Sequence, residues 1–216
     1  LDADGSVWST GYNGNGQLGL NNGNSCVLPQ QMKTEDGTKI LYGIKEIANG
    51  RLHTVLLKED GTVLAVGYNG YGQLGNQTTV QKTLPVKIVD AEGNEVTDIK
   101  HIYAAGDTTT LTRHNKDGKT QGMYTIGYNP NGALFTRDTQ YRTSATEVET
   151  EKNILTTALT ENYGGAQTGL IVNDEGKVYT VGYNANGEMG NETVENLIAP
   201  WCISNIKLEV NPHIIN

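Results

Sequence analysis

The chain has only two cysteines, and neither lies near a second metal ligand. Cys26 and Cys202 stand near opposite ends of the 216 residues, and no His or Cys flanks them at the spacings that bind zinc. Two cysteines cannot form a disulfide framework for so large a domain, and we disfavour a single Cys26–Cys202 bridge because the two residues lie near opposite ends of the chain. The sequence therefore predicts no metal site and no bound cofactor.

Basic residues are also scarce. Lys and Arg number 16 against 24 Asp and Glu, which gives a formal net charge of −8, and the basic residues are scattered. A partner with a phosphate backbone needs clustered Lys and Arg, so the sequence argues against nucleic-acid binding. No apolar run approaches the ~18 residues that span a bilayer, so no membrane insertion is expected.

No initiator methionine or signal-type apolar segment opens the chain. It begins in the middle of a motif, at Leu1-Asp2-Ala3-Asp4-Gly5, as an excised or processed piece of a longer protein would.

Proline is scarce at 5 residues, whereas glycine is abundant at 27. The glycines follow no three-residue period, which excludes collagen, and apolar residues alternate in many short stretches, which argues against disorder. Short strands joined by Gly/Asn turns are typical of an all-β architecture.

One motif recurs four times. Gly-Tyr-Asn followed by a glycine-rich loop begins at residues 11, 67, 127 and 182, so the copies are spaced by 56, 60 and 55 residues. A turn of the Asp-Gly type precedes each anchor, and Asp-Gly between apolar segments is a strong hairpin signal. These turns are Asp4-Gly5, Asp60-Gly61, Asp117-Gly118 and Glu175-Gly176. Repeats of this spacing indicate an array of small supersecondary units.

Between these landmarks the pattern has the period of two expected of strands. Each unit reads as a strand, a Gly-x-x turn, a second strand, an Asp-Gly hairpin, a third strand and a glycine-rich loop whose Asn can bond nearby backbone. Such a meander buries both faces only when neighbours stack, and radial stacking makes a β-propeller. We expect about four blades in an incomplete ring or arc, with repeats at 1–43, 44–98, 99–153 and 154–205, and with 206–216 starting a further strand or segment.

The repeat resembles that of the regulator of chromosome condensation family. Residues Ile47 to Val86 carry the pattern nearly complete, through Gly50, His53-Thr54, Asp60-Gly61, Gly67, Asn69, Gly72-Gln73-Leu74-Gly75 and Pro85. The resemblance implies a propeller, usually of about seven blades. The third repeat departs from the pattern at Ala133-Leu134-Phe135, and the fourth has Glu188-Met189-Gly190.

A possible calcium loop, a histidine and two glycosylation sequons each have a structural interpretation. Asp2-x-Asp4-Gly5 lacks the later carboxylate of a calcium loop and aligns with the hairpin turns. His53 takes a repeat position that Thr fills elsewhere, which indicates a structural hydrogen bond. Asn76-Gln77-Thr78 and Asn191-Glu192-Thr193 match the glycosylation sequon, which a chain rich in Asn and Thr produces by chance. No catalytic constellation can be inferred, so no enzyme is expected.

Positions that vary between repeats at a shared place are the best binding candidates, because scaffold positions are fixed by the fold. Two residues follow the glycine of each Gly-x-x turn and differ between copies: Arg51 and Leu52, Asp107 and Thr108, and Ala166 and Gln167. Tyr71 and Tyr128 are further binding candidates, because aromatic side chains often anchor a protein interface.

In the resembled family these turns lie at one rim, where its exchange factors meet a small GTPase. The acidic residue expected at the second variable position is absent from this alignment, which has Leu52, Thr108 and Gln167 there.

We expect a non-catalytic scaffold, secreted or on a bacterial cell surface, that binds another protein. Self-association through open blade edges is a further expectation. Three alternatives stay open: an exchange factor for a small GTPase, an inhibitor of a secreted enzyme, and a carbohydrate-binding module. A repeat fold alone does not choose among them.

Overall fold

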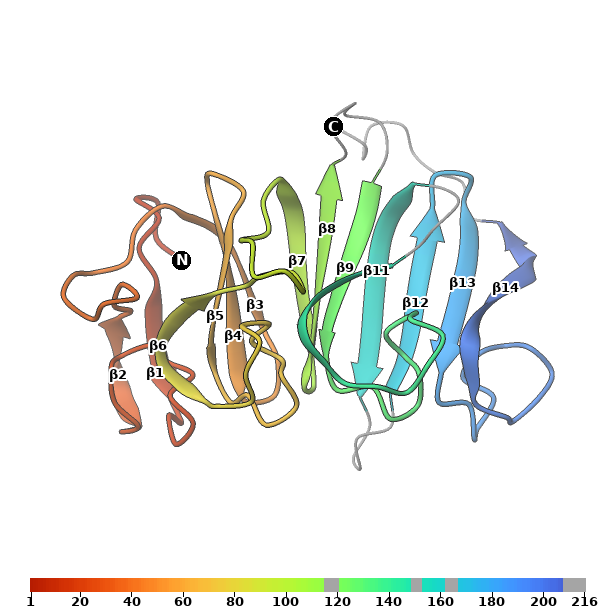
Figure 1. Cartoon of the computed structure of the whole chain (residues 1–216), viewed down its shortest axis with the longest axis horizontal. Coiled ribbons are helices and arrows are strands. Elements are labelled where there is room, and N and C mark those ends of the chain that lie inside the picture. Colours follow the sequence, from red (N-terminus) through yellow and green to blue (C-terminus); the bar gives the residue numbers. More distant parts are fainter. Residues whose placement is uncertain (115–120, 149–152, 162–166, 208–216) are drawn as a thin grey trace.

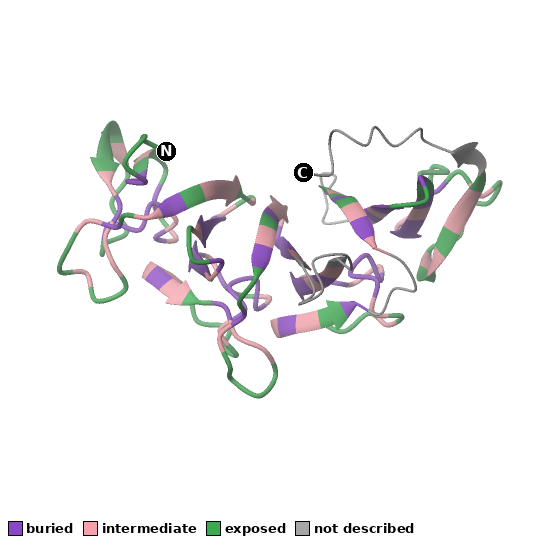
Figure 2. Ribbon diagram, turned by 90° about the horizontal axis from the view of Figure 1, so that it is seen from above, coloured by how far each residue is buried: buried purple, intermediate pink, exposed green. Residues whose placement is uncertain are grey.

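The computed structural model describes residues 1–114, 121–148, 153–161 and 167–207. These residues form fourteen strands in four antiparallel sheets and no helix (Figure 1). Seen from above, the sheets follow one another along an arc (Figure 2). The prediction of an all-β array of about four meander blades is confirmed.

The first sheet has two strands and each of the others has four. The first blade contains β1 (Trp8–Gly11) and β2 (Cys26–Gln31). The second contains β3 (Ile44–Asn49), β4 (His53–Lys58), β5 (Val63–Gly67) and β6 (Lys82–Lys87). The third contains β7 (Ile99–Ala105), β8 (Thr108–His114), β9 (Gln121–Gly127) and β10 (Arg142–Val148). The fourth contains β11 (Ile154–Glu161), β12 (Gln167–Asn173), β13 (Lys177–Gly182) and β14 (Leu197–Lys207).

Strands lie beside their sequence neighbours in every four-stranded sheet. The repeats expected to begin at residues 44, 99 and 154 begin where the strands β3, β7 and β11 begin. At the other end β14 continues to Lys207, two residues past the boundary drawn at 205, and residues 208–216 lie outside the described residues.

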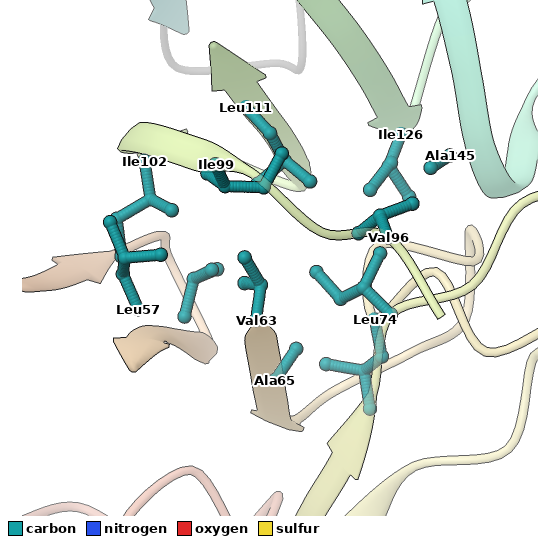
Figure 3. Packing of buried hydrophobic residues seen from close by; sticks show 12 residues of the cluster. Leu57, Val63, Ala65, Leu74, Val96, Ile99, Ile102, Leu111, Ile126 and Ala145 are labelled. Atoms are coloured by element: carbon teal, nitrogen blue, oxygen red, sulfur yellow. The ribbon is translucent and has the colours of Figure 1, made fainter. Parts of the chain in front are cut away.

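The second sheet is buried on both faces. Leu56 and Leu64 pack toward the first sheet, whereas Leu57 and Val63 pack toward the third. Because successive side chains of a strand point to opposite faces, a sheet covered on both sides carries continuous apolar runs. The core between the second and third sheets is drawn in Figure 3. Stacking of neighbouring blades therefore supplies the core that one meander lacks.

The Asp-Gly hairpins form as expected where they are described. Gly61 has a φ of +83°, and its N–H donates to the Lys58 carbonyl over 3.0 Å. Asp60 accepts from the N–H and hydroxyl of Thr62, and these hydrogen bonds lower the pKa of Asp60 to about 2. The predicted turn at Asp117-Gly118 lies outside the described residues.

Both thiols are free, at Cys26 and Cys202. None of the described residues forms a helix with the length and apolarity of a bilayer span.

Candidate interaction surface

Two kinds of loop meet at one rim of the arc. In the second blade His53, the first residue of β4, pairs with Gly67, the last residue of β5. The Gly-x-x turn before β4 and the Gly-Tyr-Asn loop after β5 therefore lie at the same end of the sheet. The third and fourth blades repeat this register, so we call this end the loop rim and the opposite end, which carries the Asp-Gly turns, the hairpin rim.

A buried asparagine holds each Gly-Tyr-Asn loop from within. Asn69 donates from Nδ2 to the carbonyls of Thr78 (2.9 Å) and Val80 (3.2 Å), and its Oδ1 accepts from the Leu74 N–H (2.9 Å). The same network forms in the other three blades around Asn13, Asn129 and Asn184. A side chain that satisfies three backbone groups fixes the path of a loop that lies outside the named strands.

The two sequon asparagines belong to this anchor. Asn76 Oδ1 accepts from Asn69 Nδ2 (3.1 Å) and from the Thr78 hydroxyl (2.9 Å). Asn191 makes the equivalent bonds to Asn184 and Thr193. The Asn-x-Thr pattern therefore has a structural origin in the loop.

The strand register corrects the alignment of the third Gly-x-x turn. Thr108 pairs with Gly127 as His53 pairs with Gly67, so Asp107 is the equivalent of Leu52. Thr108 belongs to the strand and is not a variable turn residue. The expectation that no acidic residue occupies the second variable position is therefore wrong, because aligning on the glycine shifted this turn by one residue.

Asp107 is an inter-blade contact and not an exposed acid. Its side chain is 2% exposed, it accepts from the guanidinium of Arg51 in the second blade, and it accepts from Gln73 Nε2 over 3.0 Å. Arg51 is half-exposed above it. Since a buried carboxylate needs a partner, the pair ties two blades together and presents Arg51 to solvent.

Thr108 and Gln167, two other residues predicted to bind a partner, are also buried between blades. Gln167 Nε2 donates to the Thr108 hydroxyl over 2.9 Å, and that hydroxyl donates to the Tyr128 carbonyl over 3.1 Å. Both side chains are fully buried, so they join the third and fourth blades. Leu52 is partly buried and its carbonyl accepts from the Tyr68 N–H. Ala166 lies outside the described residues.

His53 is a buried histidine with a structural contact. Its Nε2 lies 2.9 Å from the Thr109 hydroxyl of the next blade, and burial lowers the pKa of His53 to about 4. The imidazole is therefore neutral at physiological pH.

Replacing His53 with Thr, the residue at equivalent positions, is expected to flatten the pH dependence of stability. The folded pKa lies below the unfolded value of 6.5, so the unfolded chain binds the extra proton and stability falls as pH drops from 6.5 to about 4. Across this pH window the free energy of unfolding of the wild type should fall by about 3 kcal/mol more than that of the variant. Urea unfolding at pH 7.0 and 4.5 measures the difference. If the free energy of unfolding fell by the same amount between the two pH values in both proteins, His53 would not be the cause.

Four tyrosines from two blades form a cluster on the loop rim. The Tyr71 ring centroid lies 4.5 Å from that of Tyr128, 5.3 Å from that of Tyr141 and 6.1 Å from that of Tyr68. Tyr128 and Tyr141 also lie 5.3 Å apart. The structure thus brings together the two predicted aromatic anchors, and this tyrosine cluster is the strongest candidate site on the described surface.

Sequence patterns did not single out Tyr68 or Tyr141. Tyr141 directly precedes Arg142, which pairs with Gly127, so strand register alone returns it to the loop rim. Tyr68 follows Gly67 in the anchor motif and folds back over Gly70, where an added Cβ would overlap its hydroxyl. Tyr141 remains 47% exposed.

Tyr68 connects the cluster to the Arg51–Asp107 pair. Burial raises the pKa of Tyr68, with smaller contributions from neighbouring Tyr71 and Asp107, while Arg51 opposes the shift. The Tyr68 N–H donates to the carbonyl of Leu52 over 2.8 Å, and Leu52 directly follows Arg51, so the ion pair and the tyrosines are neighbours on the loop rim. The resulting surface combines aromatic rings with an arginine, the residue types enriched at the centres of protein interfaces.

Family models match the first half of the chain. A model described as the regulator of chromosome condensation (RCC1) repeat matches residues 4–57 and 60–112, and a second model of that description matches residues 44–73. Together they cover residues 4–112.

The chain is similar to parts of longer proteins. The probable E3 ubiquitin-protein ligase HERC4 of Homo sapiens is 35% identical over 144 residues, which are 67% of this chain and 13% of the ligase. The ultraviolet-B receptor UVR8 of Arabidopsis thaliana is 28% identical over 187 residues, which are 87% of this chain and 39% of the receptor.

Solved structures share the fold. Human WBSCR16 superposes with a TM-score of 0.69 at 23% identity, over 94% of this chain and 48% of that protein. Prp20p from Saccharomyces cerevisiae gives a TM-score of 0.69 at 20% identity, over 95% and 48%. The chain spans about half the length of these structures, and the likeness confirms the propeller fold.

Proposed function

Because the chain belongs to the regulator of chromosome condensation (RCC1) repeat family, we propose that it is a non-catalytic propeller segment that binds another protein through its loop rim. The observation that carries this proposal is the tyrosine cluster with Arg51 beside it. The yeast relative Prp20p is described with binding to Gsp1p and histones, and a further structure holds it with Kap60. These relatives support a protein partner.

The loop rim is suited to binding because it is held in place before a partner arrives. Asn69 and Asn129 fix the loops that carry the tyrosines, and the rings already pack on one another. A preorganised surface loses less conformational entropy on association, which favours affinity. Tyrosine adds apolar area together with a hydroxyl that can hydrogen-bond.

We also propose an extracellular or cell-surface location in a bacterium. The acidic, Asn- and Thr-rich composition and the low cysteine content support it. Detection of the parent protein in the culture medium or on intact cells tests this location, and its recovery only from the cytoplasm would contradict it.

A second candidate function is exchange on a small GTPase, and Asp107 favours it. The corrected register puts this acid at the variable position where the resembled family meets its GTPase. The carboxylate would have to leave Arg51 and Gln73 to reach a partner. A nucleotide-release assay that stays flat with every GTPase tried removes this candidate.

Photo-crosslinking tests the proposed function. A photoreactive phenylalanine analogue in place of Tyr141 is expected to capture a protein partner from medium or extract. The same analogue in place of Tyr42, which is 52% exposed beside the hairpin rim, is the control and should not capture it. Capture of a glycan alone would replace this proposal with the carbohydrate-binding module. Capture of a secreted enzyme whose activity stops would replace it with the enzyme inhibitor. Capture of the same protein from both positions would show that the partner binds a different surface.

A further inference from the structure

Two rings of the tyrosine cluster lie close enough to be joined by a covalent bond. The Tyr71 and Tyr128 ring centroids are 4.5 Å apart, and the ring planes are inclined by 50°. When a carbon–carbon bond joins two phenol rings directly, their centroids lie only slightly closer than this. Rotation of the two side chains is therefore enough to bring together the ortho carbons, which are the ring carbons next to the hydroxyl groups.

Tyr141 gives an oxidant access to these two rings. Its side chain is 47% exposed, whereas Tyr71 and Tyr128 are partly buried. The Tyr141 ring centroid lies 5.3 Å from each of the other two centroids. Because rings at this separation are in van der Waals contact, an electron passes readily from one ring to the next. A phenoxyl radical formed on Tyr141 can thus move to Tyr71 or to Tyr128.

Other exposed tyrosines lack such neighbours. Tyr12 is 62% exposed and Tyr42 is 52% exposed, and among the described residues neither makes a ring contact with another aromatic side chain. A radical on either of them can couple only with a second molecule. Coupling within one chain is therefore specific to the tyrosine cluster.

Sulfur atoms, which compete with phenols for oxidants, do not compete at this site. The two cysteines, Cys26 and Cys202, lie on β2 and β14 in the first and fourth blades, whereas the cluster belongs to the second and third. Met32, Met123 and Met189 are buried. The tyrosines are thus the accessible oxidisable groups of this part of the loop rim.

We propose that the tyrosine cluster is a site of oxidative crosslinking, at which a haem peroxidase with hydrogen peroxide couples Tyr71 to Tyr128. Each phenol gives up one electron and one proton and becomes a phenoxyl radical. The two radicals form a carbon–carbon bond between their ortho carbons, which release their hydrogens as protons while the two oxygens are protonated again. One molecule of hydrogen peroxide accepts the two electrons and two protons, its O–O bond breaks, and two molecules of water leave.

The crosslink joins the second blade, which carries Tyr71, to the third, which carries Tyr128. These residues lie far apart in the chain, and a covalent bond between distant residues restricts the unfolded chain, as a disulfide does. The modification therefore stabilises the junction between the two blades. It uses only contacts within the chain, so it does not depend on partner binding by the loop rim.

Treatment with a haem peroxidase and hydrogen peroxide, followed by mass spectrometry of the monomer, tests the proposal. The wild-type monomer is expected to lose two hydrogen atoms and, after proteolysis, to give a crosslinked peptide that contains Tyr71 and Tyr128. Tyr71→Phe keeps the ring but lacks the phenol oxygen, so it should fold normally and lose this product. Tyr42→Phe is the matched control and should give the product in wild-type yield.

N-acetyltyrosine in a parallel reaction shows that the oxidant is active. The proposal would be overturned if the wild type stayed unmodified while N-acetyltyrosine coupled, or if it formed crosslinks only between molecules. Coupling within the chain at any other pair of residues, or an unchanged yield in Tyr71→Phe, would overturn it as well.

Discussion

Replacing Asn69 with alanine is expected to lower the free energy of unfolding by about 3 kcal/mol, because a buried backbone group that loses its partner costs about 1–3 kcal/mol. The Leu74 N–H is buried and loses its acceptor, and the carbonyls of Thr78 and Val80 lose their donor. The two carbonyls lie in an exposed segment where water can partly replace the amide. Urea unfolding followed by circular dichroism measures the loss.

Asn94→Ala is the control for this prediction. Asn94 is exposed, and its side chain donates to Asp90 within an outer turn. A surface change of this kind is expected to cost about 0.5 kcal/mol or less. If Asn69→Ala cost no more than Asn94→Ala, the buried amide would not be what holds the loop.

Replacing Tyr71 with alanine is expected to weaken binding of the crosslinked partner by about 30-fold or more, the range of an interface residue that contributes about 2 kcal/mol. Tyr71 contacts the other three rings, so its loss removes contact area and also the support of Tyr128 and Tyr141. Tyr128→Ala should have a similar effect. Titration calorimetry or biolayer interferometry with purified partner measures both.

Stability and binding must be separated for these variants. Tyr71 lies in a loop fixed by Asn69, so its variant should keep the wild-type unfolding midpoint within a few degrees. Tyr42→Ala removes an exposed tyrosine beside the hairpin rim and should leave affinity unchanged. A loss of affinity as large in Tyr42→Ala as in Tyr71→Ala would place the partner elsewhere.

The architecture was predictable because its signals are local and repeated. Each Asp-Gly turn joins two apolar segments, and Gly61 adopts the left-handed backbone that this turn needs. The spacing of the Gly-Tyr-Asn copies gave four blades, and the stacking that buries Leu57 and Leu64 on opposite faces follows from their continuous apolar run.

The candidate site was only partly predictable, because its contacts cross between blades. The sequence predicts Tyr71 and Tyr128 as separate aromatic anchors, and nothing in the spacing of the copies indicates that their rings lie 4.5 Å apart. Alignment on the turn glycine displaces Asp107 by one residue, because Gly106 directly precedes Asp107 whereas Gly50 lies two residues before the equivalent Leu52. Thr108 and Gln167 look like exposed turn residues, yet each is buried by its hydrogen bond to a neighbouring blade.

Amide hydrogen exchange with and without the crosslinked partner tests most directly whether the loop rim is the binding face. Binding is predicted to slow exchange in residues 67–75 and 127–141, which carry the tyrosine cluster, and to leave the hairpin-rim turns at 58–62 and 173–177 unchanged. Protection of the hairpin-rim turns with no change in the tyrosine loops would contradict the proposed function.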